Sequence, residues 1–331
     1  MTRTARLSTL LLSTIAATIA LHGPSHALLS KTFVSNTGND AGSCNSATNA
    51  CQTLAAAVGK TAPGGEVTVV NAGDYSNGGT INITHSIHIT NDFGGDAGIT
   101  VPAGQVGFAI SAGVGDVVSL RGLVIDGQYV GTTGISIFQA QAVHIQNCVI
   151  RNFQAAGLGT GIGMVPVGNT DLLVSDTLIF NNGTVANTGG ITIRPTGVGV
   201  ANVVLDRVHL ENNVNGLTVD SNSAASGAGS HVILRDSVAS SNAGDGILAM
   251  TGTAHPPAFI VVERSTSVSN AGVGIHAVGP GGTILVSDTT ISRNGQGVSA
   301  NNAGQIISYG NNRNNNNVGA EGTATGTLPL F

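Results

Sequence analysis

Residues 202–217, NVVLDRVHLENNVNGL, contain the whole pattern on which the fold prediction rests. An aliphatic residue stands two places before a polar residue, an Asn follows that polar residue by six places, and Gly with an aliphatic residue comes soon after. In this copy they are Val204, Asp206, Asn212 and the pair Gly216-Leu217. The same order recurs on both sides of this stretch, so the chain is built from repeats.

The copies align on the polar residue, which we interpret as a bend between two strands. The bend positions are Asn147, Asp176, Asp206, Asp236, Arg264 and Asp288, at intervals of 29, 30, 30, 28 and 24 residues. The aliphatic column before them contains Ile145, Val174, Val204, Leu234, Val262 and Val286, and the column after them contains Phe153, Asn182, Asn212, Asn242, Asn270 and Asn294. We expect the aliphatic column to face inward and the five amides to stack as an asparagine ladder.

The strand-length segments are short, rich in Val, Ile and Thr, and interrupted by Gly and Asn, and no window within the repeat has helical periodicity. Such a coil cannot pair within itself. It must pair in parallel with the coils before and after it, about 4.7–4.9 Å away. The sequence therefore predicts an all-β solenoid with about nine coils between residues 81 and 320.

These columns resemble the repeat of the pectate-lyase-like superfamily, whose members are secreted right-handed parallel β-helix proteins. Residues 32–58 also resemble the N-terminal cap of exported members, in which a strand and a short helix, here expected at 52–58 and ended by Pro63-Gly-Gly65, cover the open end of the solenoid. We expect three segments, a signal peptide over 1–27, a cap and first strand over 28–80, and a β-helix with a polar tail over 81–331.

The N-terminal segment predicts export. Two arginines precede an apolar run from Leu7 to Leu21, and Ser25-His26-Ala27 offers small residues for cleavage. The run is too short to cross a bilayer comfortably, and no later segment approaches 18 continuous apolar residues. We expect a secreted, periplasmic or cell-surface protein without a membrane span once the signal is removed.

Composition narrows the possible partners. Charged residues make up 9% of the chain, the net charge is −5, and the 12 Lys and Arg residues form no basic stripe. Nucleic-acid binding needs clustered cations that neutralise phosphates, so a nucleic-acid partner is not expected. The 48 glycines serve the tight bends that a helix-free coil needs.

The three cysteines divide into a pair and a single residue. Cys44 and Cys51 are seven residues apart in a polar loop, and an exported protein meets an oxidising environment, so we expect a disulfide between them. Cys148 lies next to a bend without a spare partner, and we interpret it as a buried thiol rather than a nucleophile.

The bend column contains the candidate catalytic residues. Asp176, Asp206 and Asp236 are expected on successive coils about 5 Å apart, with Arg207 near them. Three adjacent carboxylates repel, so they need either compensating cations or a bound Ca²⁺. The alternative, which we favour, is that each Asp accepts backbone N–H bonds at its bend and that the protein needs no cofactor.

A second candidate is a ligand-binding groove in the coil that contains Arg121, Asp126, Tyr129 and Phe138, because aromatic, cationic and acidic residues coincide there in the sequence. The alternative places Phe138 in the core and Tyr129 in a turn.

Three functions stay open. The first is an exported, non-catalytic β-helix with a surface, adhesive or glycan-contacting role, whose partner is a polysaccharide or a cell-surface glycan. The second, by resemblance alone, is a lyase, epimerase or hydrolase that acts on acidic polysaccharide. The third is a purely structural rod.

Overall fold

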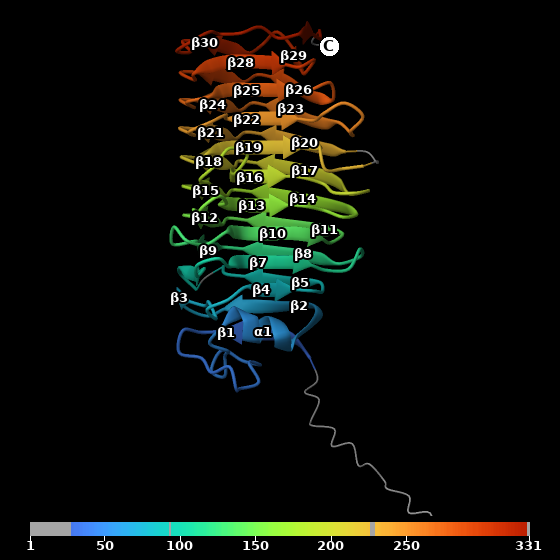
Figure 1. The fold of residues 1–331 in the computed structure, drawn as a ribbon. Coiled ribbons are helices and arrows are strands. Elements are labelled where there is room, and N and C mark those ends of the chain that lie inside the picture. Colours follow the sequence, from blue (N-terminus) through green and yellow to red (C-terminus); the bar gives the residue numbers. More distant parts are fainter. Residues whose placement is uncertain (1–27, 93, 226–228, 330–331) are drawn as a thin grey trace, which may run out of the picture.

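A computed structural model of the chain describes residues 28–92, 94–225 and 229–329 and shows a parallel β-helix of about nine turns (Figure 1). The predicted signal segment, 1–27, lies outside the described residues. In the part of the chain that is described, no helix is long and apolar enough to cross a membrane. The predicted all-β solenoid is confirmed.

Each complete turn contributes one strand to each of three sheets that run along the rod. The twelve-stranded sheet contains, in spatial order, β1 (Leu29–Val34), β2 (Thr61–Val69), β5 (Ile87–Thr90), β8 (Val117–Arg121), β11 (Ala142–Gln146), β14 (Asn169–Ser175), β17 (Val200–Asp206), β20 (Ser230–Arg235), β23 (Ala258–Glu263), β26 (Gly282–Ser287), β29 (Gln305–Ser308) and β31 (Gly326–Thr327). The ten-stranded sheet contains β3 (Gly73–Asp74), β6 (Ala97–Thr100), β9 (Leu123–Asp126), β12 (Val149–Arg151), β15 (Leu178–Phe180), β18 (His209–Glu211), β21 (Val238–Ser240), β24 (Thr266–Val268), β27 (Thr290–Ser292) and β30 (Arg313–Asn315). The nine-stranded sheet contains β4 (Ile81–Ile83), β7 (Val106–Ser111), β10 (Thr133–Gln139), β13 (Thr160–Met164), β16 (Gly189–Ile193), β19 (Asn215–Asp220), β22 (Ile247–Met250), β25 (Val273–Val278) and β28 (Gln296–Asn301).

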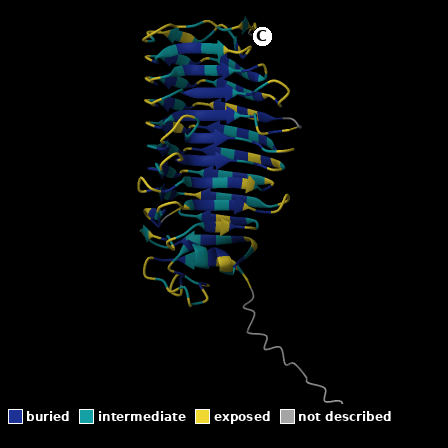
Figure 2. Cartoon of the chain, viewed as in Figure 1, coloured by how far each residue is buried: buried dark blue, intermediate teal, exposed yellow. Residues whose placement is uncertain are grey.

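The core is a stack of aliphatic side chains inside the coil. Inward positions of successive strands of the twelve-stranded sheet are filled by Ile145, Val174, Leu205, Leu234, Val262 and Val286, all at most 2% exposed. Side chains alternate between the two faces of a strand, so their neighbours on the same strands point outward. Figure 2 shows the central strands β13, β16 and β19 of the nine-stranded sheet buried along their length.

The predicted register is wrong by one residue in the coil after Asp176. Asp206 pairs with Ser175 and Arg235, and the positive φ of the bend, 53°, belongs to Arg207. The coil from Asp176 to Arg207 is 31 residues long, one more than the interval assumed from the sequence. Leu205 accordingly takes the inward place that the repeat assigned to Val204.

The asparagine ladder is present with the same one-residue correction. In each coil the backbone N–H at the ladder position donates to the Asn Oδ1 of the next coil, from Phe153 through Asn182, Asn213, Asn242, Asn270 and Asn294 to Asn317, at 2.9–3.1 Å. Asn213 therefore replaces the predicted Asn212. These amides satisfy backbone groups that bends would otherwise leave unpaired inside the rod.

The N-terminal end is closed by the short helix α1 (Leu54–Lys60), which packs on β1, β2 and β4. The helix begins two residues later than predicted, because Thr53 caps it by accepting from the Ala56 N–H at 3.2 Å. It ends before β2, which includes Pro63-Gly-Gly65, the predicted helix end. The β-helix thus begins inside the region assigned to the cap and first strand, since β2 already pairs with β5.

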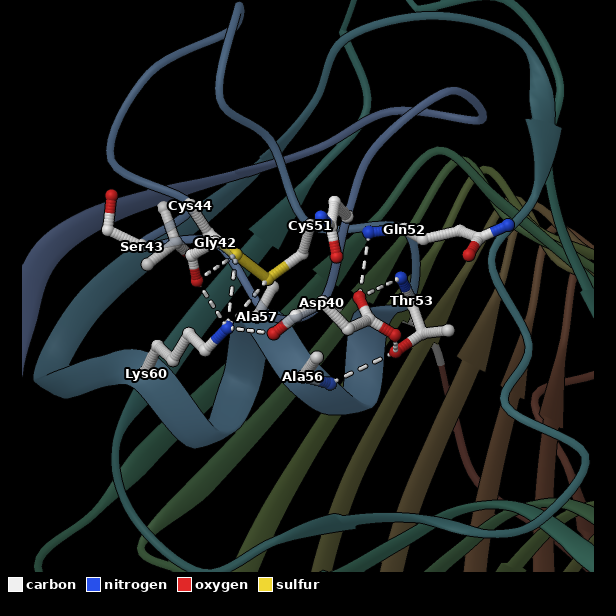
Figure 3. The surroundings of a disulfide bond; sticks show 12 residues. Asp40, Gly42, Ser43, Cys44, Cys51, Gln52, Thr53, Ala56, Ala57 and Lys60 are labelled. Carbon is white, nitrogen blue, oxygen red and sulfur yellow. Dashed lines mark hydrogen bonds between the residues drawn. A yellow bond between two sulfur atoms is a disulfide. The ribbon is translucent and has the colours of Figure 1, made fainter.

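The predicted disulfide between Cys44 and Cys51 is present and ties the loop in front of α1 (Figure 3). Lys60 donates from Nζ to the backbone oxygen of Gly42 at 2.6 Å and approaches Cys44 Sγ at 3.5 Å. Asp40 Oδ1 accepts from the N–H groups of Gln52 and Thr53, so this loop holds the first turn of the helix.

At the opposite end the C-terminal tail folds across the last coil. Ala320 and Glu321 accept backbone bonds from Gly297 and Val298 at 2.8 Å, and β31 pairs with β29. The polar tail therefore covers backbone groups that would otherwise form an open edge.

Candidate functional site

The bend column between the twelve-stranded and ten-stranded sheets alternates in charge. Its members after Asn147 are Asp176, Arg207, Asp236, Arg264 and Asp288, each with φ between 45° and 53°. Asp206, predicted as a member, is instead the last residue of β17, with an 11% exposed side chain. The three carboxylates therefore do not form a column of adjacent like charges.

Arg207 connects two of the candidate carboxylates. It binds Asp176 of the preceding coil through Nε at 2.6 Å and Nη2 at 2.9 Å, and it binds Asp206 through Nη1 at 2.6 Å. Arg235 approaches the other oxygen of Asp206 at 3.2 Å. Hydrogen bonding to Arg207 holds the pKa of Asp176 below its usual value, because the guanidinium favours the charged form.

The next coil repeats this arrangement. Arg264 binds Asp236 through Nε at 3.0 Å and Nη2 at 2.9 Å, and its Nη1 contacts Glu263 at 2.9 Å. The Arg264 hydrogen bonds likewise lower the pKa of Asp236. Among the described residues, no group of three or more His, Cys, Asp or Glu side chains is arranged to hold a metal ion.

The structure does not bring the predicted ligand-binding residues together. Arg121 ends β8 in the twelve-stranded sheet and pairs with Asp92 at 3.1 Å. Asp126 ends β9 in the ten-stranded sheet, Tyr129 lies in the following turn with φ 65°, and Phe138 lies in β10 of the nine-stranded sheet. Because these sheets face different directions, the four side chains do not form one groove. Phe138 is 41% exposed, so it is not a core residue.

Cys148 is buried, and burial raises the pKa of its thiol to about 11. A thiol of this kind stays protonated at neutral pH and is a poor nucleophile.

A groove lies instead on the outer face of the twelve-stranded sheet. It has a volume of about 690 Å³ and crosses β11, β14, β17, β20 and β23. Its floor is formed by outward aliphatic side chains on four successive coils, Leu173, Val204, Ile233 and Val261. Ile233 is 41% exposed and lies beside Val204 and Val261 in register, so the apolar surface here is contiguous across strands.

Polar and aromatic groups flank this floor. Two residues earlier on the same strands stand Asp171, Asn202, His231 and Phe259, which register places side by side. The rings of His231 and Phe259 lie 6.1 Å apart at 52°. Asn202 donates to Asp171 Oδ1 at 2.9 Å. The groove thus combines an apolar strip with hydrogen-bonding groups and a ring pair.

These groove residues were not among the predicted site residues, although the sequence contains a signal for them. The segments Leu172-Leu173-Val174, Val203-Val204-Leu205 and Val232-Ile233-Leu234 are apolar at three successive positions. A strand with one solvated face alternates in polarity, so each triplet indicates that the outer face is apolar too, and the pairing register assigns the middle residue to that face.

The fold and the groove define a solenoid of parallel coils with an apolar groove on the outer face of its twelve-stranded sheet. The chain belongs to the family described as the right handed beta helix region, whose model matches residues 109–285, more than half of the chain. No protein of curated function matches the sequence.

Solved structures with a similar fold include a pectate lyase and a viral protein. The pectate lyase Pel9A is 15% identical with a TM-score of 0.62, and the likeness covers 91% of this chain and 78% of that one. ORF18 of Geobacillus virus E2 is 13% identical with a TM-score of 0.50, over 76% of this chain and 52% of that one. At these identities the likeness is one of fold.

Proposed function

We propose that the protein is an exported, non-catalytic glycan-binding protein, and that the groove on the twelve-stranded sheet contacts a polysaccharide. The groove supports this proposal, because its apolar strip and its flanking hydrogen-bonding groups match the two kinds of surface that a sugar chain presents. An elongated groove across five strands also suits a linear polymer.

Export is part of the proposal. The disulfide between Cys44 and Cys51 supports it, because such bonds persist in oxidising compartments. We propose that the mature chain works outside the cytoplasm, at the cell surface or free of it.

The ion pairs argue against catalysis at the bend column. Asp176, Asp206 and Asp236 each contact a guanidinium group, so their charges are already compensated. General acid catalysis requires a carboxyl that holds a proton near neutral pH, and the lowered pKa of Asp176 and Asp236 opposes this.

Binding is tested by affinity electrophoresis in gels that contain soluble polysaccharides. We expect Phe259→Ala to lose retardation, because the ring contributes to the groove. Phe180→Ala is the matched control, since Phe180 lies on β15 of the ten-stranded sheet. Equal retardation of the two variants would remove the groove from the proposal.

A catalytic role is the second candidate, because the groove lining includes one carboxylate, Asp171, and two imidazoles, His144 and His231, which are side chains used in acid–base chemistry. Incubation with acidic and neutral polysaccharides, with and without Ca²⁺, followed by detection of unsaturated uronates and new reducing ends, tests it. Product formation that Asp171→Asn abolishes would replace the binding proposal. A chain that neither binds nor cleaves any glycan would favour the structural rod.

A further inference from the structure

The groove lacks the cations that an acidic polymer requires. Its lining contains no Lys or Arg, and Asp171 is its one carboxylate. A polyuronate carries a negative charge on each sugar, so its binding depends on basic groups that compensate those charges. Nothing in the lining as described supplies a permanent positive charge.

The arginines beside the groove are already paired. Two residues beyond Val204, Ile233 and Val261 on the same strands stand Asp206, Arg235 and Glu263, which continue the same outer face. The ion pairs along this side of the groove join three guanidinium groups to four carboxylates. The guanidinium groups are those of Arg207, Arg235 and Arg264, and the carboxylates are those of Asp176, Asp206, Asp236 and Glu263. This border therefore carries no positive surplus, and Asp171 on the opposite side adds another negative charge.

The floor offers what an uncharged sugar chain needs. Leu173, Val204, Ile233 and Val261 recur once per coil, and neighbouring strands are about 4.7–4.9 Å apart. A pyranose unit of an extended chain advances by a similar length, so successive rings can lay their C–H faces on successive side chains. The stripe continues on the next two coils through Leu285 and Ile307.

We infer that the ligand of the groove is an uncharged polysaccharide and that polyuronates are excluded. This inference rests on the proposed glycan-binding function and adds the class of glycan. The charge of the groove, and not the fold, distinguishes this chain from a protein that binds an acidic polymer.

The test uses the mature chain with two panels in affinity electrophoresis and titration calorimetry. The neutral panel is soluble β-glucan, xylan and galactomannan, and the acidic panel is polygalacturonate and alginate. We expect binding to at least one neutral polymer and none to the acidic polymers. Ile233→Lys should weaken neutral binding by about tenfold or more, because a bound neutral chain would remove the lysine charge from water without offering it a partner. It should also create measurable binding to polygalacturonate.

Val238→Lys is the matched control, because Val238 is a half-buried outward residue of β21 in the same coil but on the ten-stranded sheet. It adds the same charge and should bind as the original chain does. Thermal melts of both variants establish that each is folded.

The outcomes separate the two proposals. Tighter binding of the original chain to polyuronates than to neutral polymers would overturn this inference and leave glycan binding intact. Binding to neither panel would overturn both. Self-association in sedimentation velocity that Ile233→Lys abolishes and Val238→Lys preserves would show that a second copy covers the groove, which would also overturn the inference.

Discussion

Arg207 binds Asp176 of the preceding coil with both carboxylate oxygens engaged, Nε to Oδ1 at 2.6 Å and Nη2 to Oδ2 at 2.9 Å. The same geometry recurs one pair later between Arg264 and Asp236. Two-point pairing fixes the guanidinium plane, so the bend column is an ordered inter-coil contact.

Charge exchange tests this contact. Arg207→Asp should lower the melting temperature, because it places a third carboxylate beside Asp176 and Asp206. The double variant Asp176→Arg with Arg207→Asp should recover part of that loss, since it restores an opposite-charge pair. Differential scanning calorimetry measures both. No recovery in the double variant would show that the pairing does not contribute to stability.

Acidification should weaken the same contacts. The folded pKa of Asp176 and Asp236 lies below the value of about 3.9 expected for an unfolded Asp. Their stabilisation is therefore present above the unfolded pKa and is lost as the pH falls through the lowered folded pKa. The melting temperature should fall more steeply below about pH 4 for the original chain than for Asp176→Asn with Asp236→Asn. Parallel curves would contradict the assignment.

The asparagine ladder should matter more than the surface pairs. Asn242 is 1% exposed, accepts from the Asn213 N–H, and donates to Leu210 and Asn270 oxygens. Asn242→Ala leaves these groups unpaired inside the rod, and we expect a loss of about 1–3 kcal/mol in the free energy of unfolding. Asn45→Ala, at an exposed loop position, is the control and should change little. Denaturant titration of both variants measures the difference.

The disulfide should stabilise the cap. Cys44 and Cys51 close a short loop, for which the loss of chain entropy corresponds to about 2–3 kcal/mol. The variant Cys44→Ser with Cys51→Ser should therefore become sensitive to limited proteolysis near α1, as mass spectrometry of the fragments would show. First cleavage in the middle coils instead would contradict a local role for the bond.

The fold could be predicted from the sequence because each coil repeats the same order of strands and bends. Inward aliphatic residues and ladder amides recur at fixed offsets, and stacking of like positions follows from parallel pairing. The prediction failed by one residue at Asp206, because Asp206 and Arg207 are both polar and a longer coil shifts the bend from one to the other.

The candidate site was harder to predict for two physical reasons. Residues that are close in the sequence, such as Arg121 and Phe138, lie on different sheets because the chain turns around the axis between them. The groove residues come from five strands, and outward apolar residues such as Leu173 and Ile233 resemble core residues when a triplet is read by hydrophobicity alone. Only the pairing register shows which residues of a triplet face the core and which face the solvent.

The most direct test of the account locates the bound glycan by hydroxyl-radical footprinting. The chain would be oxidised alone and with the neutral polysaccharide of the panel that it binds most tightly. We predict that oxidation of Leu173, Ile233 and Phe259 falls on binding, while oxidation of the exposed Tyr129 and Phe138 is unchanged. Protection of Tyr129 or Phe138 with no change at the three groove residues would contradict the account.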